Sequence, residues 1–242
     1  MEPEQARQLL QTAPEADPET LWEDYQQRAF ELKDQLLRQT VVVALAASRL
    51  RRLSGLGKAL AALWPAGMPY PMAANVPEGW SETSLVAALN GTTPWHDPAA
   101  AWPTLNLPAT ATLVEALRSY EQALMHRKQQ LSAQWMAEGI AFHYWHMVQV
   151  QAAYESLWHG WMLDWTLPVP PPEVKVAEQV DSGQMIRVLQ QAGLEDQAVL
   201  PARPLAAEWR ERLLPGHPEA VALIDREVAR VRKVHTLLAT KK

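Results

Sequence analysis

The sequence of 242 residues contains no cysteine, so disulfide bonds, thiolate nucleophiles and thiolate metal ligands are all excluded. Its 10 glycines are spread thinly, and none belongs to a phosphate-binding loop or a dinucleotide-binding fingerprint. The Gly-x-Ser-x-Gly nucleophile elbow and the His-Glu-x-x-His zinc motif are also missing. We therefore expect a protein that is not an enzyme, and we predict no catalytic residue, no cofactor and no small-molecule ligand.

Long hydrophobic runs are missing as well. The densest apolar run, residues 41–47, is far shorter than the roughly 20 residues that cross a bilayer as a helix. The first residues are acidic and polar, whereas a signal peptide carries basic residues followed by an apolar stretch. Because a cysteine-free chain also suits a reducing compartment, the sequence predicts a cytoplasmic protein with no membrane span.

Phenylalanine is scarce and tryptophan is abundant, with 2 Phe against 11 Trp. Tryptophan buries a large apolar ring while its N–H seeks a hydrogen-bond acceptor, so it suits both cores and interfaces. The formal net charge of −5 argues against a surface built entirely for nucleic acid, although it leaves room for a local basic patch.

Apolar residues recur at alternating steps of three and four over residues 19–54, which is the pattern of a helix with one buried stripe. Gly55 and Gly57 follow this segment, and we expect the helix to end there. The stripe consists of Trp22, Tyr25, Ala29, Leu32, Leu36, Val43, Ala46, Leu50 and Leu53, and only Gln39 breaks it.

A second long helix is predicted over residues 110–167, and Pro168 ends it. Gly139 and Gly160 weaken this helix locally, so a break near either one would agree with the pattern. At 100° per residue, one narrow face of the helix collects Met136, Ile140, His143, Met147, Val150, Tyr154, Trp158, Trp161 and Trp165.

Eight prolines lie between the two predicted helices, and we expect residues 65–109 to form a proline-rich irregular insertion. We predict an all-α fold in which two long helices form an antiparallel hairpin core, with this layer between them and a small C-terminal group of shorter helices. The predicted segments are a flexible leader over 1–18, the hairpin core over 19–167, a proline linker over 168–176 and a C-terminal helical subdomain over 177–242.

Three shorter helices are predicted in the C-terminal subdomain, over residues 182–191, 205–214 and 218–239. Gly193 ends the first of them. No segment of five residues alternates cleanly as a strand would, although residues 173–176 could be extended.

The tryptophan-bearing face of the second helix gives the leading functional hypothesis. Such a face is most often the core of the fold, but tryptophan and methionine are also enriched at the centres of protein interfaces. We therefore hypothesise a non-catalytic helical structural subunit that assembles with itself or with other proteins. Its predicted partner-binding residues are Met147, Tyr154, Trp158, Trp161 and Trp165.

Two groups of basic residues support an alternative, a component that associates with nucleic acid. Lysine and arginine that follow one helix edge can contact successive phosphates, although the same residues are also typical of a solvated helix face. The first group contains Arg49, Arg51, Arg52 and Lys58, and the second contains Arg226, Arg230 and Lys233.

Histidine spacing gives a more distant alternative, a metalloprotein built on a helical bundle. His143 and His146 are three residues apart, and Glu155 and His159 are four apart, so each pair could place two ligands on one metal ion. A di-iron bundle needs two Glu-x-x-His motifs and further carboxylates, and these motifs are missing. We therefore assign no metal ligand.

Overall fold

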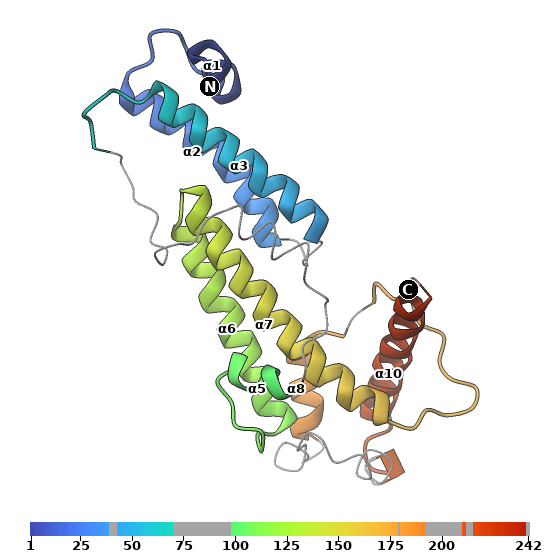
Figure 1. Ribbon diagram of the computed structural model, residues 1–242. Helices are drawn as coiled ribbons and strands as arrows, with labels where there is room; N and C mark the ends of the chain where they lie inside the picture. Colours follow the sequence, from blue (N-terminus) through green and yellow to red (C-terminus); the bar gives the residue numbers. More distant parts are fainter. Residues whose placement is uncertain (39–42, 70–97, 179, 192–209, 212–214, 241–242) are drawn as a thin grey trace. The chain divides into compact units, whose positions relative to one another are not determined.

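The computed structural model describes residues 1–38, 43–69, 98–178, 180–191, 210–211 and 215–240 (Figure 1). Helices hold 74% of these residues and no strand occurs among them, which confirms the predicted all-α class. No helix in the described ranges combines the length and the apolar character needed to span a membrane. The helices are α1 (Pro3–Leu10), α2 (Pro18–Arg38), α3 (Val43–Leu63), α5 (Pro98–Thr104), α6 (Leu113–Ala133), α7 (Ala137–Asp164), α8 (Ser182–Gln191) and α10 (Pro218–Ala239).

Polar side chains fix the first turn of three helices. Asp17 accepts a hydrogen bond from the backbone N–H of Thr20 at 2.8 Å, and this bond lowers the pKa of the Asp17 carboxyl. Thr112 and Glu115 form a reciprocal capping box at the start of α6, because the N–H of each residue donates to the side chain of the other. Asp181 caps α8 through its carboxylate. These caps satisfy backbone donors that the first turn of a helix leaves without partners.

The first predicted long helix is divided in two. α2 ends at Arg38 and α3 begins at Val43, and the two helices pack against each other. The predicted end at Gly55 and Gly57 is wrong, because α3 continues through both glycines to Leu63. Each glycine costs a helix up to about 1 kcal/mol, but buried leucines on either side of the pair anchor α3 in the core.

The second predicted long helix is also divided. α6 ends at Ala133 and α7 begins at Ala137, so the break lies close to Gly139, one of the two places that the sequence indicated. The amide oxygen of Gln134 lies 2.5 Å from the position that a Cβ at residue 139 would take. Glycine therefore lets the side chain of the turn fold over the first turn of α7.

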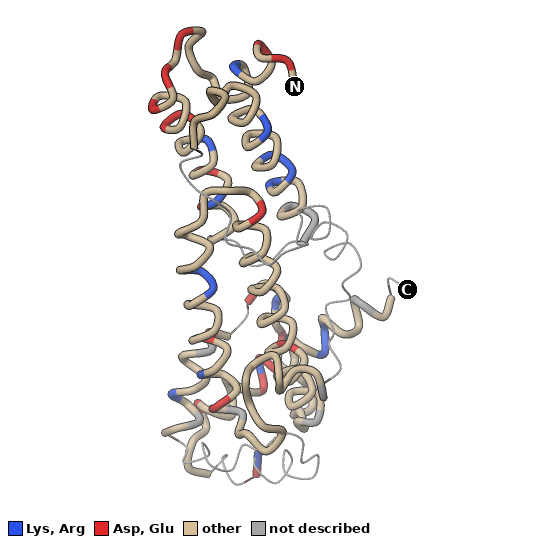
Figure 2. The backbone as a smooth tube through the Cα atoms, turned by 60° about the vertical axis from the view of Figure 1, so that its left-hand side comes forward, with Lys and Arg blue, Asp and Glu red and all other residues tan. Residues whose placement is uncertain are grey.

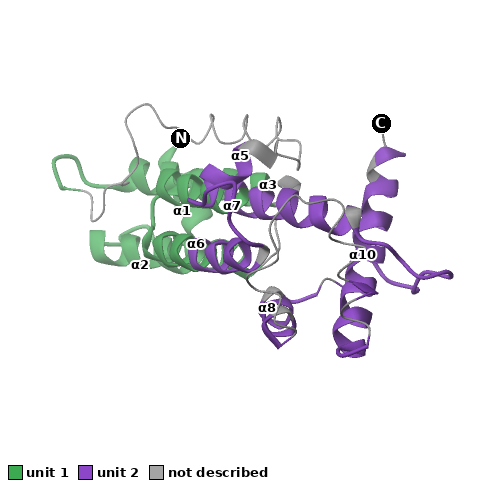
Figure 3. Ribbon diagram, turned by 90° about the horizontal axis from the view of Figure 1, so that it is seen from below, with its two compact units in different colours: residues 1–93, 124–148 green, residues 94–123, 149–242 purple. Residues whose placement is uncertain are grey.

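The chain folds into two compact units (Figure 3). Unit 1 contains residues 1–93 and 124–148, and unit 2 contains residues 94–123 and 149–242. The boundary falls inside α6 and inside α7, and each unit has its own apolar core. The two units therefore interleave along the chain, whereas the segments predicted from the sequence are contiguous.

The core of unit 1 brings together α1, α2, α3 and the parts of α6 and α7 that belong to this unit. α1 packs on both α2 and α3, so the predicted leader contains a folded helix, with Ala6 and Leu10 buried on one side of it. The predicted stripe lines this core through Tyr25, Ala29, Leu32, Leu36, Ala46, Leu50 and Leu53.

In unit 2, α5 and α6 pack as an antiparallel pair, with the other helices around them. α5 belongs to the predicted proline-rich insertion, and its Trp102 is buried in the core. Residues 70–97 of this insertion lie outside the described residues.

The C-terminal helices α8 and α10 have the bounds that the sequence predicts. Their buried side chains, among them Met185 on α8 and Ile224 on α10, join the core of unit 2. The third predicted helix of this region, over residues 205–214, falls mostly outside the described residues.

Candidate functional site

The tryptophan-bearing face of α7 lies in the interior of unit 2. Its aromatic rings form a continuous series, with centroid distances of 6.0 Å from Tyr154 to Trp158, 6.0 Å from Trp158 to Trp161 and 5.4 Å from Trp161 to Trp165. All four side chains are at most 6% exposed. Met147 is buried as well, but it lies in the core of unit 1. The predicted partner-binding residues therefore belong to two cores, and none of them lines a surface.

Two carboxylates on α10 accept the indole protons of this series. Trp158 Nε1 donates to Glu227 Oε1 at 2.9 Å, and Trp165 Nε1 donates to Asp225 Oδ1 at 2.8 Å. Asp225 is 6% exposed and Glu227 is 1% exposed. A buried indole N–H needs such a partner, so these two bonds allow the tryptophans to be core residues.

An arginine neutralises each of these carboxylates. Arg230 binds Glu227 through two hydrogen bonds of 2.7 and 2.6 Å, and Arg210 Nη2 donates to Asp225 Oδ2 at 2.9 Å. Burial alone would lower the pKa of Arg230, but the hydrogen bond and the charge of Glu227 outweigh it and raise this pKa. Arg230 is thus a buried partner of Glu227, and its predicted role as a phosphate contact is not available to it.

A second polar group on α7 lies near Arg230. Burial and the charge of Arg230 lower the pKa of His159 to about 3, so this imidazole is neutral at pH 7. Burial raises the pKa of Glu155, although the hydrogen bond from Gln151 and the charge of Arg230 oppose it. The rings of His159 and His235 lie 5.6 Å apart.

Metal ligation finds no support in the described part of the chain. There, no group of three or more His, Asp or Glu side chains converges on a point where a metal ion could bind. Burial lowers the pKa of both His143 and His146, and the ring of Phe142 packs against each of them. These contacts are those of histidines packed within the protein.

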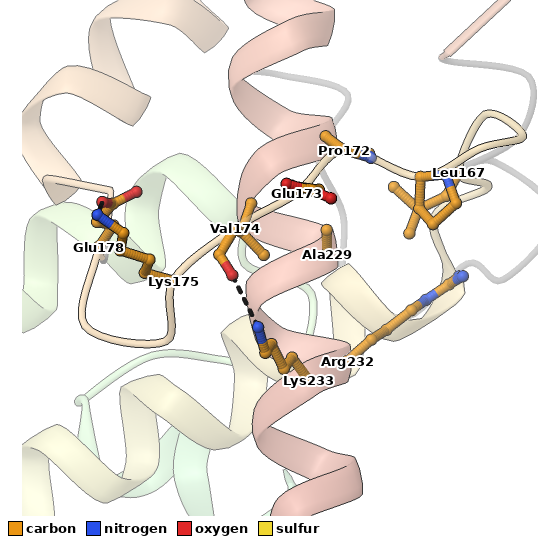
Figure 4. A pocket seen from close by; sticks show the side chains of 10 residues that line it. Leu167, Pro172, Glu173, Val174, Lys175, Glu178, Ala229, Arg232 and Lys233 are labelled. Carbon is orange, nitrogen blue, oxygen red and sulfur yellow. Dashed lines mark hydrogen bonds and ion pairs between the residues drawn. The ribbon is translucent and has the colours of Figure 1, made fainter.

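An open groove of about 780 Å³ lies in unit 2, between α10 and the extended chain that follows α7 (Figure 4). We call residues 168–178 the proline segment. Leu167, Pro172 and Val174 line one wall of the groove, and Ala229 and Lys233 line the other. The close-up shows both walls facing the same opening.

Basic side chains of α10 hold the proline segment in place. Lys233 Nζ donates to the carbonyl oxygen of Val174 at 3.0 Å, and Arg226 pairs with Glu178 at 3.8 Å. Arg232 donates to backbone carbonyls at the end of α7. Two of the predicted nucleic-acid contacts, Arg226 and Lys233, therefore bind groups of this unit itself.

Two large exposed apolar side chains lie on the elements that form the groove, although neither of them lines it. In the described part of unit 2, these exposed side chains are Val169, at 97%, and Leu237, at 49%. Val169 belongs to the proline segment, and Leu237 lies one helical turn beyond Lys233 on α10.

The remaining predicted basic residues lie on α3 of unit 1, which carries four basic and no acidic residues (Figure 2). Arg51, Arg52 and Lys58 are exposed, and Arg49 is half-buried. Arg51 and Arg52 line a pocket with residues of α1 and α2, whereas Arg49 and Lys58 do not line it.

The sequence did not predict a buried polar cluster at the turn between α6 and α7, in which Lys33 and Tyr25 bind backbone carbonyl oxygens. Lys33 of α2 is 2% exposed, and its ammonium donates to the carbonyl oxygens of Ser132 at 2.8 Å and Gln134 at 3.0 Å. Tyr25 donates its hydroxyl proton to the carbonyl oxygen of Trp135 at 2.6 Å. The only sequence signal is a lysine placed directly after Leu32 of the buried stripe, and many surface lysines have the same setting.

No family model, no curated protein and no solved structure matches the chain. Its function is therefore inferred from the surfaces and pockets described above. Two of them combine a concave shape with specific side chains, namely the groove of unit 2 and the basic pocket of unit 1.

Proposed function

We propose that the protein is a non-catalytic helical subunit that assembles with another protein through the groove of unit 2. The observation that carries this proposal is an open groove with apolar lining on both sides, from Leu167, Pro172 and Val174 on one wall and from Ala229 of α10 on the other. The same two elements also carry the exposed apolar side chains of Val169 and Leu237, outside the lining of the groove. Exposed apolar surface beside a concavity is typical of protein contact sites. The proposed contact thus lies on the proline segment and α10, whereas the sequence predicted it on the tryptophan-bearing face of α7.

The proline segment suits the binding of an extended peptide. Pro172 and Val174 are half-buried while Glu173 and Lys175 are exposed, which is the alternation of an extended chain with one side packed on the protein. Val174 gives its carbonyl oxygen to Lys233. The carbonyl oxygen of Lys175 accepts the backbone N–H of Glu178 at 3.0 Å. The backbone groups of Glu173 point away from Lys233, and a partner chain could pair with them.

A site-specific crosslink tests this function. A photoreactive amino acid placed at Lys175, whose side chain is 84% exposed, should give a discrete adduct with one partner protein in the native host. The same amino acid at Ala222, an exposed position of α10 that does not line the groove, is the matched control and should give none.

A filled groove provides the second arm of the test. Ala229 lies on the α10 wall, so Ala229→Trp should remove the crosslink from Lys175, whereas Ala222→Trp should leave it unchanged. Circular dichroism on both variants checks that the helices remain. Equal adducts from Lys175 and Ala222, or an adduct that survives Ala229→Trp in a folded protein, would contradict the proposal.

A further inference from the structure

A basic pocket of about 480 Å³ opens in unit 1, between the end of α1, the middle of α2 and the middle of α3. Arg28 of α2 and Arg51 and Arg52 of α3 line it, and Glu31 is the one carboxylate among the lining residues. The lining therefore carries an excess of two positive charges, in a chain whose formal net charge is −5. Such a local reversal of sign attracts anions.

The spacing of residues on α3 gathers the two arginines on one helix face. Ser48, Arg51, Arg52 and Gly55 follow one another at steps of three, one and three, so all four face the pocket. A Cβ added at Gly55 would meet no atom within 4 Å. Small residues on both sides of the arginines thus leave open space where a ligand could lie against the helix.

The arginines are available for a ligand to different degrees. Arg51 and Arg52 are exposed, and neither has an ion-pair partner within the part of the chain that the structure describes. Arg28 is half-buried and donates to the side-chain oxygen of Gln11, the residue that ends α1 in a left-handed conformation with φ of 54°. One guanidinium is thus held in place, and two are free to close on an anion.

The chemistry of the pocket indicates which anion. Guanidinium groups bind phosphate oxygens through paired, charge-assisted hydrogen bonds, and several arginines around one cavity favour a multiply charged phosphate. The pocket is also lined by Leu9, Leu32 and Leu56, which offer apolar surface to the body of an organic ligand. Its volume lies within the usual range of small-molecule sites, about 300–1,000 Å³.

We propose that this pocket binds a compact phosphate ester of nucleotide size, with its phosphates on Arg51 and Arg52 and its organic body on the leucines. Arg28 supplies the third cation from α2. The pocket lies in unit 1 and the groove lies in unit 2. Ligand binding in the pocket and assembly through the groove can therefore be tested separately.

Titration calorimetry on the full-length protein tests the proposal, with ATP as the probe and adenosine as its phosphate-free counterpart. At about 0.1 M salt, where exposed charges are largely screened beyond 10 Å, ATP should bind and adenosine should not. The double variant Arg51→Gln/Arg52→Gln should weaken the binding of ATP by about tenfold or more. Lys58→Gln removes a positive charge from the same helix outside the pocket, and it should leave the affinity within about twofold.

A steric pair of variants separates the pocket from general surface charge. Gly55→Phe fills the pocket and keeps all three arginines, so it should abolish binding. Gly57→Phe is the matched control, because Gly57 lies on the same helix, has equally open space and does not line the pocket. If both variants remain helical by circular dichroism, only the first should lose ATP.

Three results would overturn the proposal. ATP could fail to bind at this salt concentration, or the Lys58→Gln variant could weaken binding as much as the double variant does. A short oligothymidylate could also bind while ATP and inorganic tripolyphosphate do not, which would indicate an extended nucleic-acid surface instead of a compact site. Binding of ATP that is lost only in the double variant and in Gly55→Phe would support it.

Discussion

The ammonium group of Lys33 lies 3.5 Å from the ring centroid of Trp135, so a buried lysine of α2 covers the tryptophan in the turn between α6 and α7. The same ammonium binds the carbonyl oxygens of Ser132 and Gln134. Ser132 lies in the last turn of α6 and Gln134 follows the helix directly, so the partial negative charge at this helix end favours a cation there. α2 thus stabilises the break between the two helices.

Replacement of Lys33 should weaken unit 1. Lys33→Met keeps most of the apolar stem but leaves two carbonyl oxygens without their donor, so we expect the free energy of unfolding to fall by about 2 kcal/mol. Urea denaturation monitored by circular dichroism measures this change. Arg38→Met is the control on the same helix, because Arg38 forms an exposed ion pair with Asp34, and such pairs contribute little. Equal stability of Lys33→Met and the native protein would contradict this role.

Much of the core could be predicted from the sequence. Periodicity along a helix is a local property, and the predicted stripe positions Tyr25 and Leu50 are buried as expected. The bounds of α8 and α10 also followed from local signals, namely capping residues, glycine and proline. Local order of this kind does not depend on which distant segment covers the helix.

The breaks in the long helices depend on distant partners. The turn at residues 134–136 is stabilised by Lys33 and Tyr25, which lie about a hundred residues earlier in the chain. Apolar periodicity continues across such a turn, so a helix pair and a single helix have the same pattern. The continuation of α3 through Gly55 and Gly57 also depends on distant partners, because the buried leucines on either side of the glycines pack in the core of unit 1.

The candidate sites were the least predictable feature. The sequence indicated the tryptophans and the basic residues, but not the partners that bury Trp158 and Arg230. Trp158 and its acceptor Glu227 are 69 residues apart, so no local pattern joins them. The pair Arg230 and Glu227, three residues apart on one helix, was a signal that the sequence did contain. The basic pocket forms only when α1, α2 and α3 pack together, and no small-molecule ligand was expected.

Loss of a tryptophan should affect folding of the isolated protein. Trp165 is fully buried, so Trp165→Ala should lower the free energy of unfolding by about 3–5 kcal/mol. Phe30→Ala, which truncates a ring that is 57% exposed on α2, should change it far less. Chemical denaturation of both variants at one protein concentration provides the comparison. The structure would be contradicted if Trp165→Ala were as stable as Phe30→Ala.

Stability should fall on acidification because of His159. Its pKa is about 3 in the folded protein against 6.5 for the unperturbed side chain, so between these values the unfolded chain binds a proton that the folded protein does not. The contribution is complete above pH 6.5 and decreases as the pH falls toward 3. Between pH 7 and pH 5 the expected loss from this group is about 2 kcal/mol.

Denaturation of His159→Gln over the same pH range isolates this contribution. The variant should lose less stability on acidification than the native protein, because glutamine takes up no proton. His126→Gln, at an exposed position of α6, should follow the native curve. Parallel curves for the native protein and His159→Gln would show that this imidazole does not couple to folding.

The tryptophans of α7 form the interior of unit 2, where Trp158 and Trp165 bind carboxylates of α10. Exchange of their indole protons with solvent, followed by NMR in dilute protein and assigned with Trp158→Phe and Trp165→Phe, tests it most directly. We expect two strongly protected indole protons whose exchange rates do not depend on protein concentration. Rapid exchange in dilute solution, with protection only as the concentration rises, would contradict it and place these rings at an interface.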